Sequence, residues 1–242
     1  MELDSRQTRK ILQAKGVDFL YHANSLTTSC TFLQQGALLS RGTVQKRHLA
    51  QTSQNSDQLD KRFGIWNDVF LDMVDIHARA GQRNFYGPIL FVFDLKLLSI
   101  PPVRSIWITK KNPINWEPRE QRRKRFYVSV EEFRVSYNLG DFGAMLVFRD
   151  IDGVLPLKGK LRKIVIDDPD TQFDVKGKTI SALNYAINAI RSAAKMSGLR
   201  NLKIECRSCN TWCGCHQDYW KDPFMTKKFF ALNDKNVMLH LP

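Results

Sequence analysis

The sequence predicts a single mixed α/β domain of the α+β type, on three observations. Short apolar segments with strand character recur along the chain, at residues 89–93, 145–149 and 162–166. Residues 169–198 carry apolar side chains at helical spacing. The 242 residues are 43% hydrophobic, which is enough to bury one core. We therefore expect one domain over residues 1–242, with 199–242 as a candidate Cys-rich appendage.

The first forty residues are expected to hold two helices and two strands. Residues 1–18 are predicted to form a polar helix. Residues 19–22 are apolar and aromatic up to a histidine, which indicates a short buried strand. Asn and Ser at positions 24 and 25 are helix-capping residues, and apolar residues follow at helical spacing until Gly36, which favours a helix stop. Residues 37–40 form the next predicted strand.

This strand, helix, strand unit places polar residues at the ends of its strands. His22, Asn24, Ser40 and Arg41 are expected to meet around one pocket, an arrangement that suits a nucleotide. The alternative is a core edge in which the histidine is simply hydrogen-bonded. Further along, residues 43–62 are polar and without periodicity, which predicts a long loop that closes over a ligand. Residues 76–87 are predicted to be a second loop, between strands at 69–71 and 89–93.

The formal charge of +13 and the sequence pI near 9.7 predict a polyanionic partner. No apolar run near 18 residues and no signal-peptide centre stand out, so we expect a cytoplasmic protein with no membrane partner. The charge concentrates in residues 104–127, where cations alternate with rings that suit single-stranded nucleic acid. The alternative is a solvated basic surface. The candidate contacts are Lys110, Lys111, Trp116, Arg122, Arg123, Lys124 and Arg125.

The order of residues in the opening unit resembles a known family. An aromatic-His pair, a short capped helix and the pattern Gly-x-Leu-x-Ser-Arg at 36–41 resemble the opening of DarT-like ADP-ribosyltransferase toxins, which modify nucleic acids and include a CmdT-like branch that modifies messenger RNA. The resemblance implies a split, strongly curved β-sheet with flanking helices and NAD+ as co-substrate. It implies that His22 binds NAD+, that Arg41 contacts its phosphates or the catalytic centre, and that Asn24 and Ser40 lie beside them.

The resemblance also implies an aromatic ring against the nicotinamide, from Phe70 or Tyr86. A ring face beside a cationic nicotinamide contributes about 1 kcal/mol. The alternative for each ring is a place in the hydrophobic core, and this is the favoured interpretation for Phe70.

Residues 143–147, Gly-Ala-Met-Leu-Val, match the family's Gly-Glu-x-Leu-Val pattern except at the catalytic Glu. That carboxylate stabilises the charge that develops as nicotinamide leaves, so Ala144 is expected to abolish the chemistry. We hypothesise that position 144 was Glu and that Ala144 is an engineered inactivation. The alternatives are a natural pseudoenzyme, another acid such as Glu131, Glu132 or Glu205, or simple small-residue packing. Glu131 and Glu132, which precede Phe133, are also candidates for the family's substrate-recognition loop.

The resemblance implies transfer of ADP-ribose from NAD+ to a base of RNA or single-stranded DNA, by a toxin held in check by an antitoxin, in one relative together with a chaperone. The alternatives are a noncatalytic nucleic-acid-binding protein with a zinc knuckle, or an ADP-ribosyltransferase that acts on protein.

The C-terminal part contains a cysteine cluster that the resemblance does not cover. Four thiols and His216 fall within residues 206–216, which is enough for a tetrahedral zinc. The spacing of the second pair is unusual for a zinc knuckle, so free thiols or a redox switch stay open. The candidate ligands are Cys206, Cys209, Cys213 and Cys215.

Overall fold

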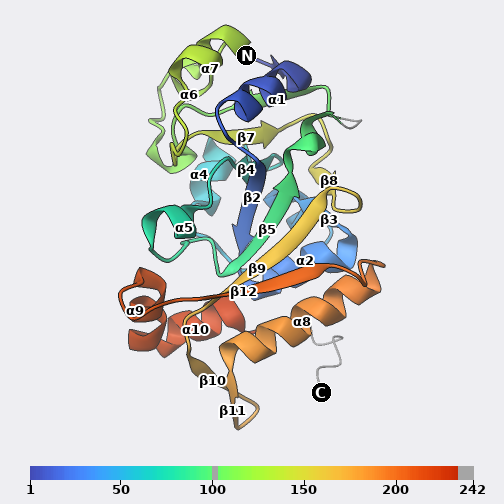
Figure 1. Cartoon of the computed structure of the whole chain (residues 1–242), viewed down its shortest axis with the longest axis vertical. Helices are drawn as coiled ribbons and strands as arrows, with labels where there is room; N and C mark the ends of the chain where they lie inside the picture. Colours follow the sequence, from blue (N-terminus) through green and yellow to red (C-terminus); the bar gives the residue numbers. More distant parts are fainter. Residues whose placement is uncertain (100–102, 234–242) are drawn as a thin grey trace.

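The protein is built around one curved, mixed eight-stranded sheet with helices on its flanks (Figure 1). The computed structural model describes residues 1–99 and 103–233, so the end of the predicted 199–242 appendage, from residue 234 on, lies outside the described residues. In sheet order the strands are β1 (Leu3–Asp4), β6 (Ser105–Ile108), β7 (Met145–Phe148), β4 (Val69–Asp72), β2 (Phe19–Asn24), β5 (Ile89–Asp94), β9 (Leu161–Asp168) and β12 (Lys203–Ser208). The β9–β12 pair is parallel, and the other neighbours are antiparallel.

The sheet is nearly divided between β4 and β2. These two strands share a single registered pair, Tyr21 with Asp72. On its other edge β2 pairs with β5 along its whole length, from Phe19–Asp94 to Asn24–Ile89. The sheet therefore consists of a β1-β6-β7-β4 half and a β2-β5-β9-β12 half that separate beyond one contact, as expected for a split sheet.

Helices and two small two-stranded sheets surround these halves. The helices are α1 (Ser5–Ala14), α2 (Leu26–Gln35), α3 (Arg41–Lys46), α4 (Asp57–Arg62), α5 (Ile76–Ala80), α6 (Arg122–Arg125), α7 (Val130–Ser136), α8 (Ala182–Met196), α9 (Gly214–Lys221) and α10 (Pro223–Phe230), with 3-10 turns at Leu95–Ser99 and Pro113–Asn115. The small sheets pair β3 (Ala37–Leu39) with β8 (Val154–Pro156), and β10 (Gln172–Val175) with β11 (Lys178–Ser181). No helix among residues 1–99 and 103–233 is long and apolar enough to span a membrane.

The opening unit folds as the sequence predicts. The Ser25 side chain caps α2 by accepting a hydrogen bond from the Thr28 backbone N–H, and Gly36 ends the helix in the left-handed conformation at φ 62°. Residues 26–33 of α2 are all buried, because the helix packs against α8, which presents small buried residues such as Ala186 and Ala193. This packing fixes the position of Asn24 immediately before the helix.

Four local predictions are wrong. Residues 43–62 are not one long loop, because they contain most of α3 and all of α4. Residues 76–87 begin with α5. Glu131 and Glu132 lie in the first turn of α7 and not in a recognition loop. The helix predicted over 169–198 begins only at Ala182, because the residues before it form the β10–β11 hairpin.

Gly87 holds the end of the Tyr86 loop against β2. Its φ of +142° is rare for residues with a side chain, and a Cβ here would lie 2.3 Å from the carbonyl carbon and oxygen of Asn24. A glycine is therefore required for the loop to approach the strand, and this close approach places Tyr86 next to Asn24.

Candidate functional site

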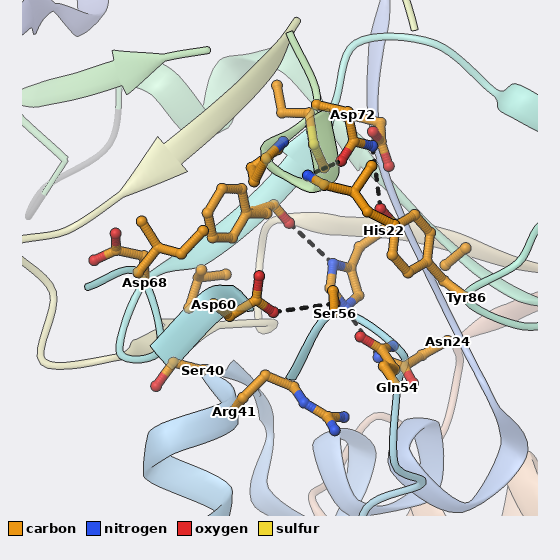
Figure 2. A pocket seen from close by; sticks show the side chains of 18 of the residues that line it. His22, Asn24, Ser40, Arg41, Gln54, Ser56, Asp60, Asp68, Asp72 and Tyr86 are labelled. Atoms are coloured by element: carbon orange, nitrogen blue, oxygen red, sulfur yellow. Dashed lines mark hydrogen bonds between the residues drawn. The ribbon is translucent and has the colours of Figure 1, made fainter. Parts of the chain in front are cut away.

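A pocket opens where the two halves of the sheet separate (Figure 2). The pocket consists of an inner chamber of about 90 Å³ and an adjoining outer groove of about 860 Å³. The chamber and the groove share Gln54, Ser56, Tyr86, Asn112 and Ile114. The chamber is also lined by His22, Asn24, Phe70, Asp72 and Met145 from the strands and by Ser40, Arg41, Asp60 and Asp68 around them. The sequence prediction that His22, Asn24, Ser40 and Arg41 surround one pocket is therefore confirmed.

His22 is held in one tautomer by the strands around it. Its Nδ1 lies 2.9 Å from the Phe70 carbonyl oxygen, which can only accept, so Nδ1 carries the proton. Its Nε2 lies 3.4 Å from Asn24 Nδ2 and accepts that amide's hydrogen bond. Burial lowers the pKa of His22 to about 4, so the ring is neutral at physiological pH. His22 thus offers an unprotonated Nε2 to the pocket.

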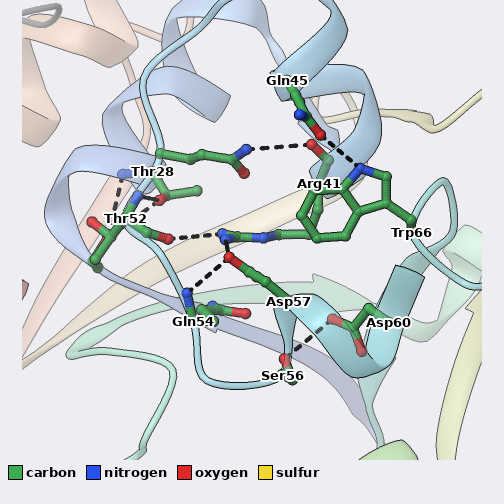
Figure 3. A network of polar contacts seen from close by, with 11 residues as sticks. Thr28, Arg41, Gln45, Thr52, Gln54, Ser56, Asp57, Asp60 and Trp66 are labelled. Atoms are coloured by element: carbon green, nitrogen blue, oxygen red, sulfur yellow. Dashed lines mark hydrogen bonds and ion pairs between the residues drawn. The ribbon is translucent and has the colours of Figure 1, made fainter. Parts of the chain in front are cut away.

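Arg41 lines the pocket, but its guanidinium is bound within the protein (Figure 3). Nη2 forms an ion pair of 2.7 Å with Asp57, and Nη1 donates to the Thr52 carbonyl at 2.9 Å. These bonds fix the segment that carries Gln54 and Ser56 over the pocket. The Ser40 hydroxyl caps α3 by accepting from the Thr43 backbone N–H at 3.1 Å. Both residues therefore shape the wall of the pocket through these contacts.

The two candidate rings both reach the pocket. Phe70 is partly buried and packs beside a small core cluster while also lining the chamber. The Tyr86 hydroxyl accepts a 3.3 Å hydrogen bond from Asn112 Nδ2, and burial raises its pKa to about 12, so it stays protonated. Tyr86 and Asn112 stand at the boundary between chamber and groove, since both line the two spaces. Sequence reasoning missed Asn112, because nothing near it in the chain signals a pocket.

Three aspartates line the chamber, and they differ in their partners. Asp68 pairs with Arg149 at 3.0 Å. Asp60 accepts from the Ser56 hydroxyl at 3.1 Å, and burial raises its pKa to about 6. Asp72 is 6% exposed, and across residues 1–99 and 103–233 its carboxylate has no hydrogen-bond or ion-pair partner. Burial and the nearby charge of Asp75 raise the pKa of Asp72 to about 7.

Ala144 does not line the pocket. It is 2% exposed and packs in the main hydrophobic cluster. Its neighbours Gly143 and Met145 line the groove and the chamber, respectively. Ala144 directly precedes β7, and it shares the main hydrophobic cluster with Leu146 and Phe148, the alternate residues of that strand. Asp72 of β4 is the registered partner of Met145 of β7, so its carboxylate is the one that lies beside Met145 in the chamber.

The predicted stacking rings of residues 104–127 are buried. Trp116 and Phe126 pack edge to face at 5.1 Å in one small core cluster, which also contains Trp107. The prediction that Trp116 stacks on nucleic acid is therefore wrong: a ring that is 5% exposed has no free face. Trp107 of β6 packs edge to face against Phe126, so the three rings bury one another. The cations of α6 instead cover this cluster, with the Arg122 guanidinium 4.1 Å from the Trp107 ring.

The cations of the basic segment divide into paired and free groups. Lys110 pairs with Glu132, and both Lys111 and Arg125 pair with Glu120. Arg123 and Lys124 are exposed, and no acidic partner is found for them among the described residues. The outer groove is lined by Lys110, Lys111, Arg83 and Lys228 and by two exposed rings, Phe85 and Phe142. The basic aromatic surface therefore exists, but its rings come from other segments than the sequence predicts.

The cysteine prediction is partly wrong. Cys206 is exposed on β12 and does not belong to the cluster. Cys209, Cys213 and Cys215 lie together, and the fourth side chain beside them is His77 of α5. His77 is 132 residues away from Cys209 in the chain, so spacing could not reveal it.

Comparisons with known proteins find similarity among solved structures alone. No protein-family model matches the chain, and no curated protein sequence matches it. Among solved structures, DarT from Thermus sp. 2.9, described in complex with ADP-ribosylated single-stranded DNA, is similar with a TM-score of 0.44 at 12% sequence identity. The alignment covers 79% of this chain and 94% of that chain. A similarity of this size does not establish a function.

Replacing Asp72 by Asn should stabilise the protein at pH 8. An aspartate whose pKa rises on folding binds its proton more tightly when folded, so its contribution to stability falls as pH rises from about 4 through about 7. Asn removes this penalty, which amounts to roughly 1–4 kcal/mol. We expect the difference in unfolding free energy between Asp72→Asn and the unmodified chain, measured by urea denaturation, to be largest above pH 7.

The matched control is Asp68→Asn, because Asp68 lines the same chamber but is paired with Arg149. Burial raises the pKa of Asp68 as well, but Arg149 opposes the rise, so this substitution should change the stability at pH 8 less than Asp72→Asn does. If Asp72→Asn were less stable than the unmodified chain at pH 8, the buried carboxylate would have an internal partner and the assignment would be wrong.

Proposed function

We propose that this chain binds NAD+, with the nicotinamide half in the inner chamber, and transfers ADP-ribose to a base of single-stranded nucleic acid. The observation that carries the proposal is Asp72, a buried carboxylate without a partner among the described residues. The other two aspartates of the chamber have partners, since Asp68 pairs with Arg149 and Asp60 accepts a hydrogen bond from Ser56. A carboxylate kept this way is suited to a cationic ligand that carries hydroxyl groups. The sequence resemblance independently suggests NAD+.

Transfer of ADP-ribose requires a negative charge beside the nicotinamide ribose, and a carboxylate supplies it. As the bond between ribose C1′ and the nicotinamide nitrogen breaks, the electron pair leaves with nicotinamide and positive charge develops on the ribose. An ionised Asp72 stabilises that charge and accepts a hydrogen bond from a ribose hydroxyl. A nucleophilic atom of the nucleic acid base then bonds to C1′ and gives up its proton. Asp72, with a pKa near neutrality, is suited to accept this proton.

His22 and Tyr86 supply the orienting contacts. The 3.4 Å bond from Asn24 to His22 Nε2 is long, so a ribose hydroxyl competes well for this nitrogen. Because His22 is neutral, it accepts that hydrogen bond without repelling the cationic nicotinamide. Phe70 and Tyr86 place rings in the chamber where a nicotinamide cation gains from an aromatic face.

The outer groove is suited to the nucleic acid that receives ADP-ribose. Its cations attract a phosphate backbone, and the exposed faces of Phe85 and Phe142 suit stacked bases. The groove meets the chamber at Tyr86 and Asn112, so a base bound in it lies next to the ribose. The choice between an RNA and a DNA target is left to the labelling experiment below. Restraint of the chain by an antitoxin, with a chaperone, is a further prediction.

One observation favours a second, noncatalytic function. Position 144 holds Ala where the resembling family has its catalytic Glu, so the chain is an inactive transferase if Asp72 does not replace that Glu. The groove then binds nucleic acid without modifying it. Transfer to a protein acceptor is a further alternative, in which the groove holds an acidic partner.

Transfer of labelled NAD+ to RNA, single-stranded DNA or protein extract distinguishes these functions. We expect the unmodified chain to label nucleic acid, with kcat/KM rising with pH until about 7 as Asp72 ionises. Asp72→Asn should lower the rate at least about 100-fold, because it removes the charge that stabilises the transition state. Ala144→Glu should not raise the rate, because it buries a charge in the core.

Labelling by Ala144→Glu alone would place the catalytic carboxylate at position 144, identify the present chain as an inactive form and overturn the role of Asp72. If no form labelled any acceptor, the transferase proposal would fail and the noncatalytic one would replace it.

Phe85 tests the groove, and Phe224 provides a matched control. The two rings are 73% and 72% exposed, but only Phe85 lines the groove. Phe85→Ala should weaken binding of a fluorescent single-stranded oligonucleotide by about 10-fold, since stacking contributes about 1–3 kcal/mol per base. Phe224→Ala should leave the affinity unchanged. Equal effects of the two substitutions would show that the groove is not the binding surface.

A further inference from the structure

Four potential metal-binding side chains converge near α9 and α5, away from the chamber. They are His77 and Cys209, Cys213 and Cys215, whose ligand atoms all lie within 4.8 Å of one another. His77 Nε2 lies 3.8 Å from Cys209 Sγ and 3.4 Å from Cys213 Sγ, and the sulfurs of Cys213 and Cys215 are 3.4 Å apart. Ligand atoms of a tetrahedral zinc with bonds of about 2.0–2.3 Å are about 3.5–3.8 Å apart. The cluster therefore already has nearly the dimensions of a zinc site.

The surroundings of His77 point to the same ligand. Its Nδ1 lies 2.7 Å from Asp167 Oδ2, which leaves Nε2 for the sulfurs. Asp167 in turn accepts from Arg207 Nε at 2.6 Å, and Arg207 pairs with Asp75 at 2.7 Å. A carboxylate that binds the outer nitrogen of a metal-binding histidine is the usual support of a zinc site, because it fixes the ring orientation.

Burial and coordination number decide what kind of site this is. His77, Cys213 and Cys215 are buried, and Cys209 is partly buried. Three thiolates and one imidazole fill all four positions of tetrahedral zinc and leave none for water or substrate. We propose that His77, Cys209, Cys213 and Cys215 bind one structural Zn²⁺ ion. This site is independent of the proposed NAD+ chemistry.

The ion would join two parts of the chain that border the outer groove. His77 comes from α5, Cys209 follows β12, and Cys213 and Cys215 lie at the start of α9. The Gly214 N–H donates to the Gly81 carbonyl at 3.2 Å, directly before the segment that carries Arg83. Arg83 lines the groove and pairs with Asp218 of α9 at 3.2 Å. Zinc would therefore hold the wall of the groove to the C-terminal helices.

The test is metal analysis of the full chain after growth with zinc, followed by exchange for Co²⁺. We expect about one zinc per chain, and for the Co²⁺ form the absorption of a tetrahedral ion together with thiolate charge-transfer bands. Cys213→Ser and His77→Ala should each lose most of the zinc. Cys206→Ser is the matched control, because this exposed cysteine is close in sequence but outside the cluster, and it should keep one zinc per chain.

Folded, unmodified protein that holds less than about one tenth of a zinc ion and gives no tetrahedral Co²⁺ spectrum would overturn the proposal. Loss of zinc from Cys206→Ser while His77→Ala keeps it would also overturn it, because the ligands would then be the four cysteines. The Co²⁺ spectrum of the unmodified chain decides the matter even if Cys213→Ser or His77→Ala does not fold.

Discussion

The pocket depends on one constraint, the single registered pair between β2 and β4. Tyr21 and Asp72 are the only residues that the ladder pairs between these described strands, and beyond them the two halves of the sheet separate. Where backbone pairing stops, the His22 side chain takes its place by donating to the Phe70 carbonyl. The chamber is therefore bounded by backbone groups, such as the Phe70 carbonyl, that would pair with a neighbouring strand in a continuous sheet. A sheet fully paired along β2 and β4 would have no room for a ligand there.

This arrangement has a cost in stability that the rest of the structure offsets. Asp72 is buried with a raised pKa, and His22 is kept neutral by burial. Around them, Arg41 pairs with Asp57 (Figure 3). Asp68 pairs with Arg149, so these four charges of the wall are neutralised. Such unpaired, buried acids concentrate at functional sites, because their charge is held for a ligand and not for the fold. Asp72 is therefore the residue at which stability and the proposed function oppose each other.

Local sequence signals predicted the fold better than the site. The capped helix between Ser25 and Gly36 and the apolar strands needed only neighbouring residues, and they were right. The sequence did not indicate Asp72, because its importance for the site comes from the lack of a partner, which only the folded structure reveals. His77 was missed because 132 residues separate it from Cys209 in the chain. Trp116 was misjudged for the same reason: only tertiary packing decides whether a ring beside cations is surface or core. At position 144 the motif suggests chemistry, whereas strand alternation directs the side chain into the core.

The most direct measurement of the central claim compares the affinities of NAD+ and NADH at pH 8 by calorimetry. The two ligands differ in the positive charge of the nicotinamide ring, and Asp72 is ionised at this pH. If the nicotinamide lies beside Asp72, the unmodified chain should prefer NAD+ by about 10-fold, equivalent to about 1.4 kcal/mol, and Asp72→Asn should remove the preference. A preference that survives in Asp72→Asn, or no binding of either nucleotide, would contradict the account.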